Sequence, residues 1–177
     1  LMIGLLAPVA FLSALLAPGE RAWRVAGTCA RLFFRLSRIP LVVRGLESLP
    51  PDPCVLAVNH TSYLDSLVLL AALKDRPFAF VAKSELLDSF VTRVFVRGLR
   101  SVSIERYDVQ KSVDHVDALV GLVRAGRSLI VFPEGTFLRQ SGLRAFRAGA
   151  FQVAAQTGVP VAVAAIRGAR SVLRDGT

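Results

Sequence analysis

The sequence predicts an α/β fold: a largely parallel or mixed sheet flanked by helices, preceded by an N-terminal membrane-associated helical segment. Short apolar runs with the length of buried strands alternate along the chain with longer segments whose apolar residues recur at helical spacing. This alternation is typical of a sheet that carries helices on its faces. The chain has 177 residues, enough for one domain with a substantial hydrophobic core.

The first element is an apolar run over residues 1–17, in which Ser13 is the polar exception. A helix over this run reaches about 25 Å at ~1.5 Å per residue, slightly less than the ~30 Å hydrocarbon core of a bilayer. The run therefore suits a tilted span, a re-entrant hairpin or an interfacial anchor. We expect residues 1–38 to be a membrane-anchoring helical segment and residues 39–177 to form the α/β domain.

A second helix is expected from about Glu20 to Ser37. Arginines are mixed there with bulky apolar residues, as they are in helices that lie at a membrane interface. An ordinary amphipathic helix packed on the core gives the same pattern. Arginines that follow an apolar run indicate the cytoplasmic side by the positive-inside rule, so we expect the protein at the cytoplasmic face of the inner (plasma) membrane.

The strands and helices of the domain follow in alternation. The first strand is expected at Leu41 to Arg44, on the edge of the sheet. Five more strands are expected where apolar runs are bounded by turn residues, at 54–58, 78–82, 102–104, 128–132 and 161–166. Helices are expected at 67–73, from Ser84 (as the cap) to about Arg97, at 113–123 and from about Phe146 to Thr157.

Composition narrows the class of partner. A formal net charge of +9, 53% hydrophobic residues and a mean hydropathy of +0.52 suit a protein that rests on an anionic membrane surface. Nucleic acid also attracts basic proteins. The charge here is mostly arginine, however, and no dense basic block is interleaved with aromatic residues, so we expect no nucleic-acid partner. Cys29 and Cys54 stand alone, which favours two reduced cysteines, and no cluster of metal ligands occurs, so we expect no metal.

A histidine and an aspartate lie together in Asn59-His60-Thr61-Ser62-Tyr63-Leu64-Asp65, between a predicted strand and a predicted helix. Ligands of open α/β sheets bind at such strand ends. Imidazole exchanges protons near neutral pH, so His60 is the first candidate for a general base, with Asp65 as the carboxylate that orients it. Alternatively, Ser62 and Asp65 have the spacing of a helix capping box, and His60 only forms hydrogen bonds in a turn.

A second polar segment, Pro133-Glu134-Gly135-Thr136, interrupts the strand that ends at Phe132. The two segments together resemble the signature blocks of the glycerolipid acyltransferase family, the 1-acyl-sn-glycerol-3-phosphate acyltransferases and their relatives. The first block, Asn-His-x-Ser-x-x-Asp, and the third, Phe-Pro-Glu-Gly-Thr, are matched in full. The second, Phe-Ile-Asp-Arg, is matched in part by Ile104-Glu105-Arg106, and the fourth, Val-Pro-x-x-Pro, by Val159 to Val163.

The resemblance covers the chain from about Val43 onward and implies an enzyme. It implies transfer of an acyl chain from an acyl-CoA or acyl-ACP thioester to the free hydroxyl of a lysophospholipid, with lysophosphatidic acid favoured. The thioester is a co-substrate, and no cofactor is expected. His60 and Asp65 would be the catalytic pair. Because the family continues with further strands, we also expect the chain to continue beyond Thr177.

The resemblance also implies a set of substrate-binding residues: Asn59, Ser62, Arg106, Glu134, Gly135 and Thr136. Gly135 permits a turn whose backbone N–H groups approach an oxyanion. Glu134 would accept a hydrogen bond from a glycerol hydroxyl, unless it pairs with a nearby arginine. Arg106 offers a planar fork of donors to a phosphate, unless it is only a surface arginine.

One departure bears on the acceptor. Family members often have arginine directly after the threonine of the third block, where this chain has Phe137, and Arg139, Arg144 or Arg147 would have to supply that charge. The alternatives are another acceptor, such as lysophosphatidylethanolamine or an amino-acid lipid, or a non-catalytic membrane-surface or nucleic-acid-binding module in which the histidine segment merely caps a helix.

Overall fold

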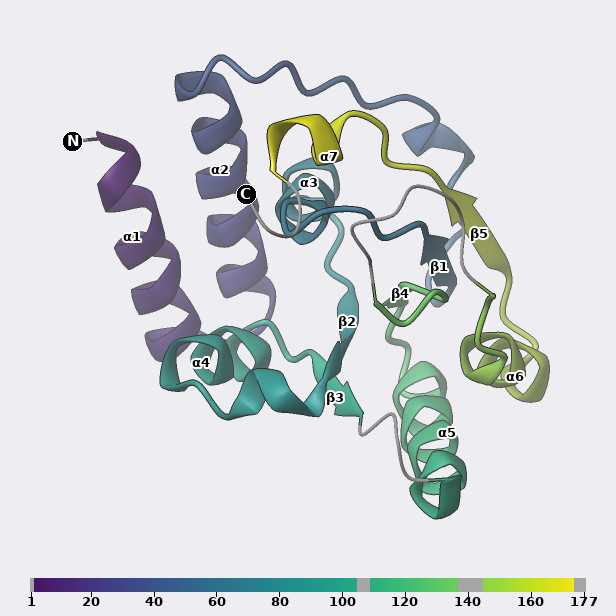
Figure 1. Cartoon of the computed structure of the whole chain (residues 1–177). Helices are drawn as coiled ribbons and strands as arrows, with labels where there is room; N and C mark the ends of the chain where they lie inside the picture. The colour runs from purple at the N-terminus through teal and green to yellow at the C-terminus, as the bar shows by residue number, and fades with distance from the viewer. Residues whose placement is uncertain (1, 105–108, 137–144, 174–177) are drawn as a thin grey trace.

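The computed structural model describes residues 2–104, 109–136 and 145–173, of which residues 2, 3 and 109–114 are described by backbone alone. Five strands form one sheet in the order β3-β2-β4-β1-β5, and every neighbouring pair is parallel (Figure 1). The strands are β1 (Val55–Val58), β2 (Ala79–Lys83), β3 (Val102–Ile104), β4 (Leu129–Val131) and β5 (Val161–Ala164). The α/β fold with a parallel sheet is therefore confirmed, and the carboxyl ends of all five strands meet at one edge.

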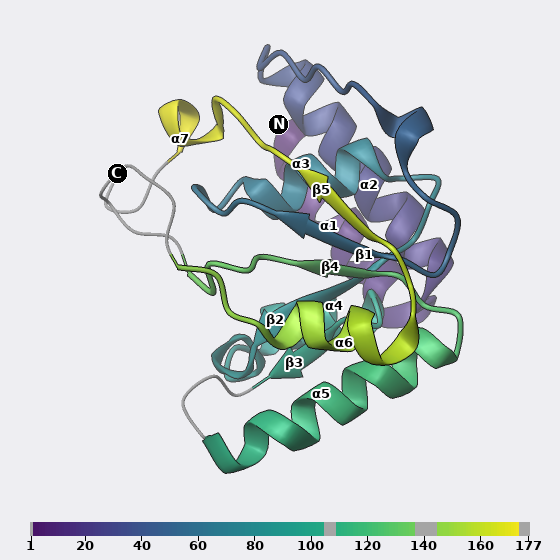
Figure 2. The same cartoon turned by 90° about the vertical axis from the view of Figure 1, so that its right-hand side faces the viewer.

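Helices cover both faces of this sheet (Figure 2). The helices are α1 (Met2–Leu16), α2 (Glu20–Leu36), α3 (Asp65–Ala72), α4 (Phe90–Gly98), α5 (Val109–Arg124), α6 (Gly149–Thr157) and α7 (Ala169–Val172). One buried cluster joins α2 and α3 to one face of the sheet, and a second joins α5 and α6 to the opposite face. Strands β1 and β4 are buried on both sides, which explains why their sequences are continuous apolar runs.

Helix α2 is built into the first of these cores. Its Trp23 is 1% exposed, and the indole Nε1 donates a hydrogen bond to the Leu73 carbonyl at 2.7 Å. At Gly27 the helix lies so close to α3 that an added Cβ would be 2.6 Å from the Leu70 carbonyl oxygen. One face of α2 is thus the buried side of an amphipathic helix, as the second interpretation of its sequence predicts.

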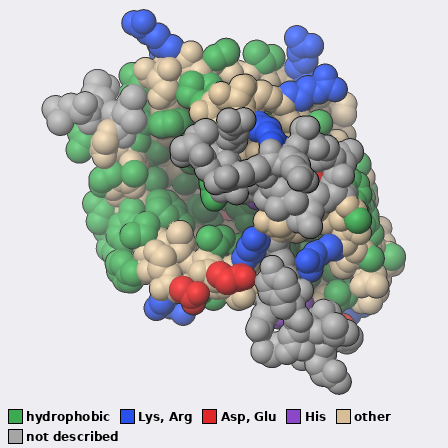
Figure 3. Space-filling view, viewed as in Figure 1, with side chains coloured by type: hydrophobic (Ala, Val, Ile, Leu, Met, Phe, Trp, Pro, Cys, Tyr) green, Lys and Arg blue, Asp and Glu red, His purple; other side chains and the backbone are tan. Residues whose placement is uncertain are grey.

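Helix α1 packs on α2 and α4 and exposes much of its apolar surface. Large hydrophobic side chains gather on the surface formed by α1 and α4 (Figure 3). They are Leu5, Val9, Leu12, Leu15, Leu16, Phe90 and Val91, each at least half exposed. In the described part of the chain, no helix combines the length and apolar character that crossing a bilayer requires.

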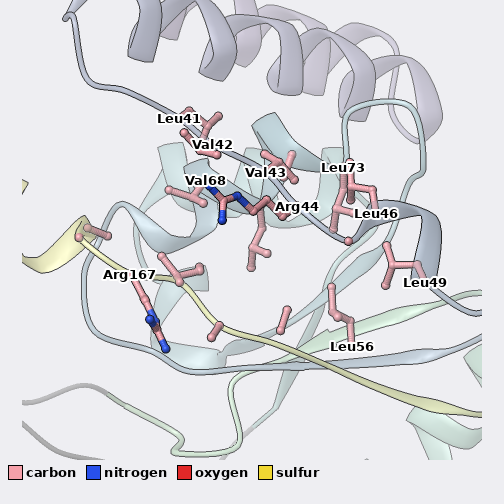
Figure 4. Close-up of a pocket in the computed structure, with 18 of the residues that line it drawn as sticks. Leu41, Val42, Val43, Arg44, Leu46, Leu49, Leu56, Val68, Leu73 and Arg167 are labelled. Carbon is pink, nitrogen blue, oxygen red and sulfur yellow. The ribbon is translucent and has the colours of Figure 1, made fainter.

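The predicted edge strand at Leu41 to Arg44 is wrong. In the described structure this segment is extended but pairs with no strand. A groove of about 1060 Å³ separates it from β5, which is the edge of the described sheet, so the two backbones are too far apart to form a ladder (Figure 4).

Three predicted boundaries also need correction. The helix expected from Ser84 to Arg97 is two elements, a 3₁₀ turn at Ser84–Leu87 and then α4, because Ser89 adopts an extended conformation. Helix α6 begins at Gly149 rather than near Phe146. The last strand stops at Ala164 rather than Ile166, because the backbone of Ile166 bonds to a side chain instead of a neighbouring strand.

Candidate active site

The histidine segment lies at the carboxyl edge of the sheet, between the end of β1 and the first turn of α3. The Nδ1 atom of His60 is 2.9 Å from Oδ2 of Asp65, and the two side chains are 17% and 0% exposed. A carboxylate at Nδ1 favours the tautomer that carries its proton there. The Nε2 atom then presents its lone pair and can accept a proton from a substrate.

Asp65 serves the loop as well as the imidazole. The same Oδ2 atom accepts the backbone N–H groups of Thr61 at 2.6 Å and Ser62 at 2.9 Å. The bond from Ser62 N–H is one half of a capping box. The other half is missing, because the Ser62 hydroxyl accepts the N–H of Leu64 rather than that of Asp65. Capping and orientation of His60 are therefore compatible roles of one carboxylate.

The loop after β4 holds His60 from two further sides. The carboxylate of Glu134, which is 5% exposed, accepts the backbone N–H of His60 at 2.9 Å. The ring of Phe132 stacks on the imidazole, with 4.1 Å between ring centroids and 18° between planes. Glu134 was expected to contact a glycerol hydroxyl, and that role stays a prediction; in this structure the carboxylate fixes the backbone of the proposed base.

Gly135 forms the predicted turn, with φ of +76°. Its N–H donates to the Phe132 carbonyl at 2.9 Å, so this donor stabilises the turn and does not point freely at a substrate oxygen. This φ favours glycine, and an added Cβ would also lie 2.8 Å from Nε of Arg147, whose flexible side chain would have to move. The turn is confirmed, whereas an oxyanion donor would have to come from a neighbouring group.

Asn59 and Ser62 both contact the chain that follows β5. The amide of Asn59 donates to the Ile166 carbonyl at 3.0 Å and accepts the Ile166 N–H at 2.7 Å. The hydroxyl of Ser62 donates to the Leu173 carbonyl. Substrate binding by these two residues stays a prediction, since their polar atoms are engaged within the protein here.

Lys83 is a residue of this site that the sequence reasoning missed. It is the last residue of β2, and its Nζ lies 3.1 Å from the hydroxyl of Thr136. A lysine at the end of a predicted strand, in a chain with only three lysines, was a signal that could have found it. Lys83 brings a positive charge beside the threonine that was expected to bind substrate.

Three arginines considered for the acceptor phosphate lie outside the described residues, namely Arg106, Arg139 and Arg144, and so does Phe137. Arg147 is described and lies against Gly135. The expectation that no metal is needed is untested. In the described ranges, no three His, Cys, Asp or Glu side chains gather as a metal site would require.

The comparisons with known proteins agree with this geometry. The model of the family described as Acyltransferase matches residues 40–167. The crystal structure of the 1-acyl-sn-glycerophosphate (LPA) acyltransferase PlsC from Thermotoga maritima is similar, with a TM-score of 0.71 and 27% identity, over 96% of this chain and 69% of that chain.

Two sequence relatives bear on the acceptor. A chloroplastic 1-acyl-sn-glycerol-3-phosphate acyltransferase, BAT2 of Brassica napus, is 33% identical over 84% of this chain and 44% of its own. A lyso-ornithine lipid O-acyltransferase of Brucella abortus is 34% identical over 60% of this chain and 37% of its own. The chain spans about half the length of the curated relatives that it matches.

Proposed function

The chain belongs to the acyltransferase family, and we propose that it is the catalytic part of a membrane-associated lysophospholipid acyltransferase. An acyl-CoA or acyl-ACP thioester would donate the chain, and the free hydroxyl of lysophosphatidic acid would accept it. The observation that carries the proposal is the contact of His60 with a fully buried Asp65, at 2.9 Å, at the carboxyl edge of a parallel sheet.

The geometry supports direct attack by the substrate alcohol. His60 Nε2 takes the proton of the lysolipid hydroxyl while its oxygen attacks the thioester carbonyl carbon. The tetrahedral intermediate collapses, the C–S bond breaks, and the imidazolium returns the proton to the departing thiolate. Asp65 stabilises the imidazolium between these two steps. Atoms and protons balance without a covalent acyl-enzyme.

The acceptor phosphate requires positive charge, and Lys83 supplies it close to Thr136. An ammonium binds a phosphate as a point charge, and a neighbouring hydroxyl adds a hydrogen bond. Arg147 lies at the same loop, and Arg106 stays a sequence-based candidate. The names of several relatives specify 1-acyl-sn-glycerol-3-phosphate as the acceptor, which supports lysophosphatidic acid.

Membrane association is the second part of the proposal. The exposed apolar side chains of α1 and α4 form the surface seen in Figure 3. The chain also carries a formal charge of +9. Apolar surface and positive charge together favour adsorption to an anionic bilayer, at the cytoplasmic face of the plasma membrane. The lysolipid would then be taken from the leaflet on which the enzyme rests.

An amino-acid lipid is the second candidate acceptor. The similarity to a lyso-ornithine lipid O-acyltransferase favours it, as does Phe137, which stands where the family resemblance implies an arginine. A less cationic site would suit an acceptor with a smaller negative charge.

The test is release of free thiol from an acyl-CoA, measured with a panel of lysophosphatidic acid, lysophosphatidylethanolamine, lyso-ornithine lipid and monoacylglycerol. We expect the highest kcat/KM for lysophosphatidic acid. The His60→Ala variant should remain folded, and its rate of thiol release should be about 10²–10⁴-fold lower than the wild-type rate. His115→Ala, which changes the only other histidine in the sequence, should keep the wild-type rate. A folded His60→Ala protein with normal turnover, or a wild-type chain inactive on all four acceptors, would refute the proposal.

A further inference from the structure

The histidine loop, residues 59–64, is fastened to a segment that lies more than a hundred positions later in the chain. This segment, residues 166–173, follows β5 and contains α7. The two contacts join residues separated by 107 and 111 positions. The carboxylate of Glu134, which lies 74 positions after His60, bonds to the same loop.

The first contact is made by Asn59, directly before the catalytic histidine. Strands β1 and β5 pair in parallel up to Val58 and Ala164. Beyond that point, the Asn59 amide takes the place of a strand and satisfies both the N–H and the carbonyl of Ile166. The side chain therefore continues the β1–β5 ladder past its last backbone pair.

The second contact is made by Ser62, which is 0% exposed. Its hydroxyl donates to the Leu173 carbonyl and accepts the N–H of Leu64 at 3.1 Å. Its own N–H donates to the Asp65 carboxylate, which in turn holds His60. An unbroken series of hydrogen bonds thus connects Leu173 to the imidazole.

Most of the segment is not buried. Within residues 166–173 only Ala169 is buried and Ile166 packs against the core. Several of the residues line the apolar groove of about 1060 Å³ (Figure 4). A segment with few buried apolar contacts depends on its hydrogen bonds for its position. The two bonds to the histidine loop therefore contribute to fixing the position of both partners.

We propose that residues 166–173 are a positioning element of the catalytic pair, and that Asn59 and Ser62 are the positioning residues through which it acts. The inference rests on the proposed function only in taking His60 as the base. It assigns to Asn59 and Ser62 a role in placing the imidazole rather than in contacting the substrate. Displacement of the segment should accordingly disturb His60 from a distance.

The experiment displaces the segment without touching the loop. Gly168 precedes α7 with φ of +83°, and Gly158 ends α6 with φ of +71°. An added Cβ meets nothing within 4 Å at either position, so Gly168→Val and Gly158→Val impose a similar backbone strain. Only the first change strains the segment that bonds to Asn59 and Ser62.

The readout is the NMR spectrum of the histidine rings, which is simple because the chain has two histidines. The His60→Ala variant assigns the two signals. We expect Gly168→Val to move the His60 signal and leave His115 in place, and Gly158→Val to leave both unchanged. An unmoved His60 signal in a folded Gly168→Val protein overturns the proposal. The measurement needs no turnover, so an inactive wild-type chain would refute the proposed function and not this inference.

Kinetics separates positioning from substrate binding. For Asn59→Ala and Ser62→Ala we expect kcat to fall by up to about 10²-fold, as a small misplacement of a reacting group does, with little change in KM for either substrate. Thr28→Ala is the matched control, since its hydroxyl bonds within α2, to the Arg24 carbonyl at 2.8 Å. A rise in KM for the lysolipid at unchanged kcat would show that Asn59 and Ser62 bind substrate, and would overturn the proposal.

Discussion

Replacement of Asp65 by asparagine tests the catalytic pair most sharply, because the structure predicts which way the new amide will face. One carboxylate oxygen of Asp65 accepts three donors, the imidazole Nδ1 and the N–H groups of Thr61 and Ser62. The other oxygen has no hydrogen-bond partner in the described structure. An amide NH₂ cannot accept from two backbone donors, so the asparagine oxygen should keep the position that faces His60.

This orientation sets the size of the effect. The imidazole keeps its tautomer, and only the charge that stabilises the imidazolium is lost. A hydrogen bond to a charged group is worth about 1.5–3 kcal/mol, so we expect a loss of roughly 10- to 100-fold in kcat. In the Ser-His-Asp triad, where the same change yields the wrong tautomer, the loss is about 10⁴-fold.

Stability should fall as well. The NH₂ group would occupy a buried position without an acceptor, which costs about 1–3 kcal/mol, while removal of a buried charge offsets part of that cost. At about 2–4 °C per kcal/mol for a chain of this size, Tm should drop by only a few degrees.

The assay is thiol release from acyl-CoA with lysophosphatidic acid as acceptor, with Tm measured on the same samples. Cys29 and Cys54 add little background, because burial keeps the pKa of both thiols above the usual value. Asp117→Asn, on the exposed side of α5, is the control. A loss of 10⁴-fold in Asp65→Asn would refute the predicted amide orientation, and a loss below about threefold would refute the role of Asp65.

Three further outcomes follow from other parts of the molecule. Lys83→Met should raise KM for lysophosphatidic acid about 10- to 100-fold, the value of a charge-assisted bond, and leave KM for monoacylglycerol unchanged; equal effects on both acceptors would contradict a phosphate contact. Gly98→Ala should destabilise the protein by about 1–3 kcal/mol in thermal unfolding, because its Cβ would lie 2.4 Å from a backbone oxygen of α1. Gly121→Ala, whose Cβ would enter open space beside α5, should instead stabilise the protein by about 0.5–1 kcal/mol. Burial raises the pKa of Asp52, but hydrogen bonds from Arg76 and a serine outweigh it and hold that pKa below the usual value. The Asp52 carboxylate therefore stabilises the folded protein above its unfolded pKa, and this stabilisation is lost as pH falls through the lower folded pKa. In denaturant unfolding, the free energies of unfolding of wild type and Asp52→Asn should converge below about pH 4. A constant difference between the two down to about pH 2 would contradict this.

Much of the fold was predictable because a buried parallel strand leaves a strong local signal. Both faces of β1 and β4 are covered by helices, so every residue in them is apolar. The helix boundaries were less predictable. The interruption before α4 depends on the extended backbone of Ser89 and on Arg93, whose Nε bonds to the Leu87 carbonyl, and no periodicity encodes either.

The strand expected at Leu41 to Arg44 shows the limit of a local pattern. Its alternation of apolar residues is compatible with a strand, but a strand also needs a partner within hydrogen-bonding distance. The groove beside β5 keeps these residues away from the described sheet. Whether an extended segment becomes a strand is therefore decided by what lies next to it.

The sequence by itself determined the catalytic pair, because His60 and Asp65 are five positions apart in one loop and their contact is local. Only the tertiary structure decided what surrounds them. The strand order β3-β2-β4-β1-β5 places the ends of β4 and β5 on either side of β1. It thereby brings Glu134 and Phe132 to His60 from one side, and Ile166 to Asn59 from the other. Contacts between residues 70 to 110 positions apart produce no local sequence pattern, because they form only when the parallel strands end at a common edge of the sheet.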